Sequence, residues 1–448
     1  MRDDCFRMVW KVWKSRRLLS KDNRGIIKLI PKADDLFLLK NWRPITLLTT
    51  TYKIVAKIIA WRLRDMLPGI IDRQQTGFIA GRSIVENILS LRMSQEWMPV
   101  TGQDVMFIKL DFQKAYDRVS HTYLWETLTA IGISQNNIRR IQGLVQGGAA
   151  QVHVNGRFTR RFEVTRGVRQ GCPLAPLLFA IATQPLMRLL REEEANGRLR
   201  GVNYGGGTTL LHQIYADDTG VNLTMDEAQF DRLKHIIQVY ESISGAKLNV
   251  SKSLIMPIGP SIPPDWTNET GCDIAGPGRG FIYLGVRTSN PVDEQQIVIS
   301  IKQKILKRLS HWSNRFLSWP AHITLLKQVL AATPLYQMLS VGIEAEGIDG
   351  LETLCRQFLW GWADQEHPKA SMIARDWNKI RKKLRWDDTC KEIPDQLTIE
   401  QAGYLIHWRD FEASKRLQSI ASYLGRLTFT QYRMGWNYCQ TIRPGWKR

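Results

Sequence analysis

The sequence predicts an α+β protein followed by a mainly helical region. Short apolar stretches such as Val105–Leu110 have the content of buried strands. Between them, stretches such as Tyr52–Leu67 carry apolar residues at helical spacing, and Pro176 can open a further helix. Beyond about residue 290, isoleucine or leucine recurs every four residues from Ile297 to Leu309, which indicates helices. Strands that alternate with helices in this order predict a sheet with helices on one face.

Turn and cap residues mark where the predicted elements begin and end. Ile26–Pro31 is predicted to be a strand that ends at its proline, and the helix of Tyr52–Leu67 should end at Pro68–Gly69. Ser120 can cap the helix that follows it. Gln151–Gly156 is a strand that enters an Asn-Gly turn, the strongest short-range signal for a hairpin.

The composition points to a polyanionic partner. Lys and Arg total 62 against 42 Asp and Glu, so the chain of 448 residues carries a formal net charge of +20 and has a pI near 9.8. Such an excess attracts polyanions, of which nucleic acid is the commonest, although a basic surface that only confers solubility is the alternative. Several of the 16 Trp lie among basic residues, as Trp10 and Trp13 do, where a flat ring can stack on a base. Most of them are more simply explained as core or interface anchors.

Cysteines and apolar runs exclude several classes of protein. The six Cys are scattered, with no Cys-x-x-Cys pair and no neighbouring His at zinc spacing, which argues against a zinc knuckle and for a reducing compartment. No apolar run reaches transmembrane length, and no charged-then-apolar signal peptide opens the chain. We therefore expect an intracellular protein with no membrane partner.

Three acidic residues stand where predicted strands end. Asp111 follows one strand, and Asp217 and Asp218 lie at the tip of a hairpin formed by Leu210–Tyr215 and Val221–Leu223. If these strands are neighbours, the three carboxylates converge, and Mg²⁺ prefers such hard oxygen ligands together with substrate phosphates. Two such ions about 3.5–4 Å apart can activate an attacking hydroxyl and stabilise the leaving oxygen. An Asp-Asp pair alone is a weak signal, because most acids in turns are solvated or act as caps.

Seven segments resemble, in order, the motifs of reverse transcriptases, and together they are very specific. Tyr215–Asp218 looks like the signature box, Lys109–Val119 like the first catalytic motif in its LINE-like form, and Arg166–Pro176 like the motif that packs on the incoming nucleotide. The others resemble two fingers motifs, a later palm motif and the primer-grip turn: Asn41–Ile45, Gln75–Ser83, Gly245–Ser253 and Tyr283–Gly285. The sequence is therefore identified as a member of the non-LTR (LINE-like) retrotransposon reverse transcriptases. The plant type is indicated because Phe358–Trp362 resembles a segment that follows the thumb in plant proteins of this kind.

The resemblance implies a right-hand polymerase of the α+β class, with fingers, a palm built on an antiparallel sheet, and a helical thumb. Residues 1–21 would be a truncated N-terminal leader, residues 22–290 the fingers and palm, and residues 291–448 the helical thumb and C-terminal region. The implied enzyme is an RNA-directed DNA polymerase that uses two Mg²⁺ and adds dNTPs to a DNA primer, or to nicked target DNA, on an RNA template. A nuclear location would suit copying at a target site, although no basic import cluster requires it. The oligomeric state stays open.

The resemblance also assigns roles to residues around the acids. Asp111 and Asp217 would bind the metal ions with the help of the backbone carbonyl of Phe112, and Asp218 would be the third carboxylate of the metal site. Lys252 resembles the lysine proposed to protonate the leaving pyrophosphate, with a solvated lysine as the alternative. The implied primer grip consists of Tyr283, Leu284 and Gly285.

A second group of residues would contact the incoming nucleotide. Tyr116 stands where this family places a bulky ring under the sugar, and such a ring would clash with a ribose 2′-hydroxyl. A core tyrosine is the alternative. Glycine at position 171 would permit a close approach of the backbone to the base pair. The remaining candidates are Gln170, Arg169, Arg43 and Arg82, with a surface salt bridge as the alternative for each arginine.

Two parts that accompany many relatives are missing from this sequence, namely an upstream endonuclease and a C-terminal Cys/His knuckle. Target nicking is therefore not expected of this chain, which would be a truncated or decaying copy or the product of a fragmentary gene, with its polymerase motifs intact. The alternative functions are a catalytically lapsed RNA-binding remnant of a retrotransposon and, more distantly, an RNA-dependent RNA polymerase. Tyr116 argues against the latter, because an RNA polymerase must accept the 2′-hydroxyl.

Overall fold

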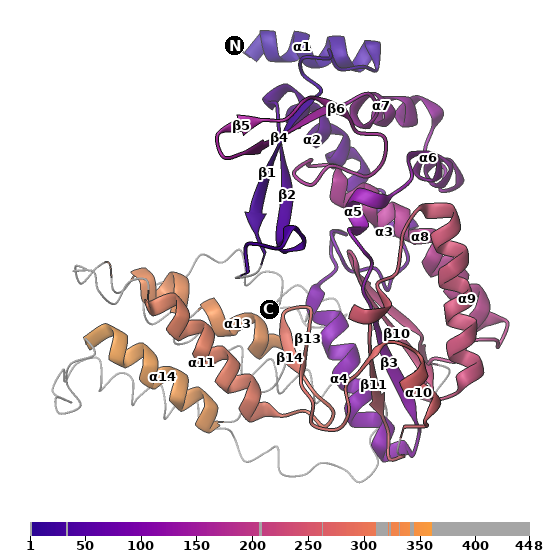
Figure 1. Cartoon of the computed structure of the whole chain (residues 1–448), viewed down its shortest axis with the longest axis vertical. Coiled ribbons are helices and arrows are strands. Elements are labelled where there is room, and N and C mark those ends of the chain that lie inside the picture. Colours follow the sequence, from indigo (N-terminus) through magenta and orange to yellow (C-terminus); the bar gives the residue numbers. More distant parts are fainter. Residues whose placement is uncertain are drawn as a thin grey trace, which may run out of the picture.

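Two five-stranded sheets, each covered by helices, organise the described part of the chain (Figure 1). The computed structural model describes residues 2–32, 35–205, 208–261, 263–310, 321, 324–330, 332–340 and 345–360. The predicted α+β class is confirmed by this architecture. Within the described ranges no helix is both long and apolar enough to cross a membrane.

The first sheet has the strand order β2-β1-β4-β5, with β6 also paired to β4. β1 is central, antiparallel to β2 and parallel to β4. The predicted Asn-Gly hairpin is confirmed, since Asn155 and Gly156 take φ values of 48° and 77° between β4 and β5. The strands are β1 (Arg24–Pro31), β2 (Trp42–Leu48), β4 (Ala149–Val154), β5 (Arg157–Phe158) and β6 (Phe162–Glu163).

Three helices pack near this sheet: α1 (Arg2–Ser15), α2 (Thr50–Arg64) and α7 (Gln135–Val145). The ring of Trp13 in α1 lies between the guanidinium groups of Arg62 and Arg140, at 4.5 and 4.3 Å from its centroid, and so joins the three helices. The predicted end of the second helix was wrong. α2 ends earlier, and Pro68 opens the separate short helix α3 (Leu67–Ile70), where a missing N–H costs nothing.

The second sheet has the strand order β12-β11-β3-β10-β9. Its pairs are antiparallel except for β11 with the edge strand β12. The predicted strand Val105–Leu110 is confirmed as β3, and the predicted acidic hairpin is confirmed as β9 and β10. The other bounds are β9 (His212–Tyr215), β10 (Asp218–Thr224), β11 (Leu254–Ile258) and β12 (Asp273–Ile274).

Helices cover both faces of the second sheet, which corrects the prediction of one covered face. Met106 and Ile108 of β3 belong to the core with α6, α8 and α9, whereas Phe107 faces the core with α4. The apolar run of β3 shows no polar alternation, which is the pattern of a strand buried on both faces, so it already argued against a single covered face. The helices are α4 (Ile84–Thr101), α6 (His121–Ala130), α8 (Ala175–Ala195) and α9 (Glu227–Ser244). The predicted cap of α6 is confirmed, since the Ser120 side chain accepts from the amide of Tyr123.

A helical group follows the second sheet and lies beside the hairpin of β13 and β14 (Figure 1). The predicted helix with a four-residue repeat is confirmed, since Ile297, Ile301, Ile305 and Leu309 are all buried. The elements are β13 (Phe281–Tyr283), β14 (Val286–Thr288), α11 (Glu294–Ser310), η3 (Leu326–Leu330), α13 (Ala332–Ser340) and α14 (Ala345–Trp360). Residues 361–448, with the end of the Phe358–Trp362 segment, lie outside the described residues. The remaining elements are η1 (Leu39–Asn41), α5 (Ala115–Arg118), β7 (Val202–Asn203), β8 (Thr209–Leu210), η2 (Val250–Lys252) and α10 (Trp266–Glu269).

Candidate active site

The second sheet brings the three predicted acids to one end. β3 and β10 are adjacent and antiparallel, and Thr219 pairs with Leu110. Asp111 directly follows Leu110 and Asp218 directly precedes Thr219, so the two acids lie at the same end of neighbouring antiparallel strands. Asp217 occupies the turn between β9 and β10, directly before Asp218.

The three carboxylates are close enough to influence one another. Burial raises the pKa of Asp218, the ammonium group of Lys109 lowers it, and the charges of Asp217 and Asp111 raise it further. The Lys109 Nζ lies 3.9 Å from the Asp218 Oδ1. Like charges gathered in this way favour a bound cation.

The donor chemistry of the site fits a hard divalent cation, but the side chains do not form a ligand cluster as they stand. Among the residues that the structure describes, no group of three or more Asp, Glu, His or Cys side chains is placed to hold a metal ion. Asp217 is exposed at the turn, so its carboxylate can move without disturbing the core. The three carboxylates thus suit Mg²⁺ because they are hard oxygen ligands and because a cation would relieve their mutual repulsion.

The segment around Lys252 holds the backbone of Asp111 through the Ser253 side chain and the Asn249 amide. The amide of Asp111 donates to the Ser253 Oγ at 3.2 Å, and the carbonyl of Asp111 accepts from the amide of Asn249 at 2.7 Å. Lys252 follows in η2 with an exposed side chain. The structure therefore places the Lys252 backbone near the acids, while its role as a proton donor stays a prediction.

Tyr116 lies near the acidic turn and is held by a second ring. Its ring stacks on Phe179 of α8, with centroids 4.4 Å apart and planes 14° apart. Burial, followed by the charges of Asp217 and Tyr215, raises the pKa of the Tyr116 phenol, so the ring is neutral and within electrostatic reach of the acid. A neutral, stacked ring can act as a rigid wall for a substrate.

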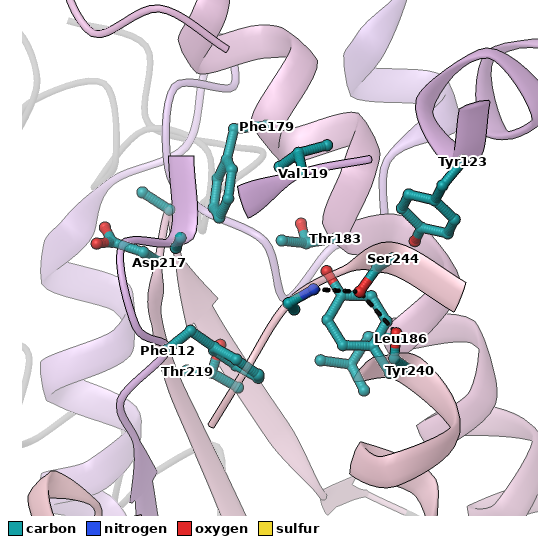
Figure 2. A pocket seen from close by; sticks show the side chains of 13 residues that line it. Phe112, Val119, Tyr123, Phe179, Thr183, Leu186, Asp217, Thr219, Tyr240 and Ser244 are labelled. Carbon is teal, nitrogen blue, oxygen red and sulfur yellow. Dashed lines mark hydrogen bonds between the residues drawn. The ribbon is translucent and has the colours of Figure 1, made fainter. Parts of the chain in front are cut away.

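A largely apolar pocket lies beside Asp217, between the sheet and its helices (Figure 2). Phe112 lines it, and its ring meets Tyr240 edge-on at 6.0 Å. The Ser244 Oγ donates to the Tyr240 carbonyl at 2.6 Å and accepts from the amide of Ala246 at 3.1 Å, which fixes the end of α9 against this pocket. Aromatic packing thus lines the side of the acidic turn that faces this pocket.

Gln170 and Gly171 pack against β2. The Thr46 amide donates to the Gln170 carbonyl at 2.8 Å. Gly171 has φ +108°, and a Cβ at this position would lie 2.4 Å from the Thr46 carbonyl oxygen. The close approach expected at Gly171 therefore exists in the described structure, but toward the first sheet, and contact with a base pair stays a prediction.

We expect Gly171→Ala to lower the free energy of unfolding by about 1–3 kcal/mol, because the backbone conformation is strained for alanine and Thr46 blocks its methyl group. Urea unfolding of both proteins measures the difference. Gly147→Ala is the matched control, since Gly147 has φ +65° with open space around it. If both variants lose the same free energy of unfolding, the collision of the new methyl group with Thr46 contributes nothing, and the prediction for Gly171 is wrong.

Arg82 and Arg169 both bind groups of the protein itself, and their predicted phosphate-binding roles stay predictions. The guanidinium group of Arg82 donates to backbone carbonyls of the loop that precedes it, those of Pro68, Ile71, Asp72 and Gln75. Arg169 is only 7 % exposed and donates to the Asn23 Oδ1 at 2.9 Å. Arg82 thus ties its own segment together, whereas the Arg169 Nε and Nη2 are buried without a hydrogen-bond partner. Arg43 is exposed on β2 and stays a candidate.

The turn at β13 and β14 connects the second sheet with the helical group. Leu284 and Gly285 take φ values of 47° and 83°, as in a two-residue hairpin turn. Tyr283 is buried, with its ring edge-on to Phe107 at 5.0 Å. The Tyr336 hydroxyl donates to the Leu284 carbonyl at 2.6 Å, which joins the turn to α13. The three residues predicted to form a primer grip thus form one anchored turn.

Two residues near the acids had no predicted role. Lys32 follows β1, and its ammonium group acts to lower the pKa of Asp218, although burial raises that pKa overall. The amide oxygen of Gln75 accepts from the amides of Gly77 and Ala216, at 2.9 and 3.2 Å. Ala216 precedes Asp217 and has φ +57°, so Gln75 supports a turn that alanine seldom adopts. The motif around Gln75 was recognised, but nothing in the spacing links it to this turn.

Gln75→Ala is expected to lower the free energy of unfolding by about 1–3 kcal/mol, because two buried amides lose their acceptor. Gln74→Ala is the control, since the sheet uses the backbone carbonyl of Gln74, which accepts from the amide of Ile214. Chemical denaturation of the three proteins provides the comparison. An unchanged midpoint for Gln75→Ala would contradict the supporting role.

Comparison with known proteins identifies the class of this fold and site. The protein-family model described as "Reverse transcriptase (RNA-dependent DNA polymerase)" matches residues 30–288 of the sequence, which is more than half of the chain. The chain belongs to the reverse transcriptase family. The fold is accordingly that of a right-hand polymerase, with the second sheet in its palm, as the sequence predicted.

The relatives come from retrotransposons. The "Transposon TX1 uncharacterized 149 kDa protein" of Xenopus laevis is 32% identical over 361 residues, covering 80% of this chain and 27% of the relative. The Pol polyprotein of the type-2 element R2DM of Drosophila melanogaster is 29% identical over 231 residues, covering 50% of this chain and 20% of the relative. The chain thus spans about a quarter of the length of these curated relatives. The predicted family, a reverse transcriptase domain of the non-LTR retrotransposon kind, is confirmed at this level.

A solved structure is similar in outline. Telomerase from Candida tropicalis in complex with a TWJ fragment of telomeric RNA matches 97% of this chain and 67% of its own, with 15% sequence identity and a TM-score of 0.46. The expected membership in the plant-type branch of these retrotransposons is not supported by the relatives described above, which come from frog and fly.

Proposed function

We propose that this chain is an RNA-directed DNA polymerase that extends a primer with dNTPs on an RNA template. The observation that carries this proposal is the gathering of Asp111, Asp217 and Asp218 at one end of the palm sheet in a member of the reverse transcriptase family. Carboxylates at that position suit nucleotidyl transfer, because the reaction needs charge stabilisation on phosphate oxygens.

The three carboxylates would hold two Mg²⁺, with the backbone carbonyl of Phe112 as a further ligand. Bound there, the ions would lower the pKa of the primer 3′-hydroxyl and stabilise the leaving oxygen. The backbone of Asp111 is held by the Asn249 amide and the Ser253 side chain, which would keep this strand end in place during the reaction. The exposed Lys252 can carry a proton on its Nζ to the leaving pyrophosphate.

Selection of the sugar is assigned to Tyr116. The ring is held flat against Phe179 and lies near Asp217, so it can form a wall where the incoming sugar reaches the acids. A 2′-hydroxyl would collide with that wall, whereas a deoxyribose would pass. Arg43, Lys32, Gln170 and Gly171 are proposed to contact the nucleotide or template.

The proposed partners are an RNA template, a DNA primer or nicked target DNA, and dNTPs. The formal net charge of +20 supports the binding of a nucleic-acid backbone. The primer strand is proposed to run along the turn of Tyr283, Leu284 and Gly285. Affiliation with plant-type elements and a nuclear location stay predictions.

The proposed function is tested with purified protein, Mg²⁺, an RNA template and a labelled DNA primer, supplied with either dNTPs or NTPs. Extension with dNTPs alone supports the proposal, whereas extension with NTPs would point to an RNA polymerase. Salt-sensitive RNA binding without extension would contradict the enzyme and leave the RNA-binding remnant. A DNA template in a parallel reaction shows whether RNA is preferred.

A further inference from the structure

Lys109 connects the acids with the primer-grip turn. Its Nζ donates to the Ile282 carbonyl at 3.1 Å and lies 3.9 Å from the Asp218 Oδ1. The side chain is 23% exposed and the Asp218 side chain 44%. One half-buried ammonium group thus contacts both a proposed metal ligand and the hairpin of β13 and β14.

The position of Lys109 on β3 explains this double contact. Side chains alternate along a strand, so Lys109 and Phe107 point to the same face, and Tyr283 of the hairpin packs on Phe107. Asp111 is the next residue of the same parity. Lys109 therefore lies between two features: the hairpin of β13 and β14, which packs on Phe107, and the acids at the end of β3.

The far side of the hairpin is held by helices. The Tyr336 hydroxyl donates to the Leu284 carbonyl at 2.6 Å, and the Lys304 Nζ donates to the Gly285 carbonyl at 3.3 Å. Side chains from α11 and α13 thus determine where the hairpin lies relative to the thumb. The contact with Asp218, in contrast, comes from Lys109.

We propose that Lys109 is a positioning residue that sets the distance between the primer-grip hairpin and the carboxylates of the active site. This inference rests on the proposed function. A primer terminus on the hairpin must meet a nucleotide held at the acids, and a bond-forming step is sensitive to small errors in that distance. Lys109 holds both ends through one side chain, whereas Lys304 holds only the hairpin.

The test compares Lys109→Met with Lys304→Met, because each removes one ammonium group from the same hairpin. Single-nucleotide extension gives kcat and the KM for primer–template. For Lys109→Met we expect kcat to fall by about 10²-fold, since a misplacement of 1 Å can have that effect. Lys304→Met should mainly raise KM, because the hairpin loosens while its distance to the acids is kept. Lys109→Arg should restore much of kcat, as a guanidinium can reach both partners.

Hydrogen exchange of the amides of residues 281–288, measured without metal or nucleotide, provides a readout besides activity. Faster exchange in Lys109→Met than in the wild type supports the anchor, and thermal unfolding of each variant shows whether the whole fold is intact. Unchanged exchange together with a kcat near that of the wild type would overturn the inference. If the wild type itself does not extend primers, the proposed function fails, and the exchange experiment alone decides whether Lys109 anchors the hairpin.

Discussion

Asp217→Asn is expected to reduce the rate of dNTP addition by about 10³–10⁴-fold, because removing one charge from a metal site forfeits several kcal/mol of stabilisation in the transition state. Asparagine has the shape of aspartate, and Asp217 is exposed in a turn, so the fold should be unaffected. The measurement is single-turnover extension of a DNA primer on RNA.

Asp226→Asn is the matched control for this substitution. Asp226 lies between β10 and α9, and its side chain caps α9 by accepting from the amide of Ala228 at 2.9 Å. Asparagine is an equally good cap, so the rate should stay that of the wild type. An Asp217→Asn protein that extends primers at a rate close to the control would remove this acid from the proposed mechanism.

Tyr116→Ala is expected to increase the use of NTPs relative to dNTPs by about 10²-fold, the scale on which a pocket distinguishes one hydroxyl group. The substitution removes the ring that stacks on Phe179 and opens space near Asp217. The ratio of kcat/KM for a dNTP and the matching NTP measures the effect.

Tyr116→Phe separates the ring from its hydroxyl group. The phenylalanine ring can stack on Phe179 in the same way, so discrimination against NTPs should be retained. If Tyr116→Ala discriminates as strongly as Tyr116→Phe, the ring is a core residue and the sugar is selected elsewhere. Thermal unfolding of both variants controls for loss of packing.

Local patterns in the sequence were sufficient for the elements that carry the acids. β3 is an apolar run with an acid after it, and the acidic hairpin is visible as two strands around Asp217 and Asp218. Strand identity follows from nearest neighbours in the chain, which is why these bounds were close. That β3 and β10 are adjacent followed only from the resemblance to a known family.

Contacts between side chains and backbone groups could not be predicted in this way. The guanidinium group of Arg82 binds carbonyls 7 to 14 residues before it, and no sequence pattern marks these as acceptors. Gln75 and Lys109, in contrast, bind backbone groups more than a hundred residues away along the chain. Such contacts depend on tertiary distances, and residue type and spacing do not determine these.

The edge of the palm sheet at β9 is already occupied. The amide of Ile214 donates to the Gln74 carbonyl, and the Ile214 carbonyl accepts from the amide of Thr76, so residues 74–76 run along this strand as a short parallel neighbour. An open edge invites pairing with another chain and thereby aggregation. A shortened version of this domain should therefore keep residues 74–76. A fragment without them would expose the edge of β9, which is prone to pairing with other chains, beside Asp217 and Asp218.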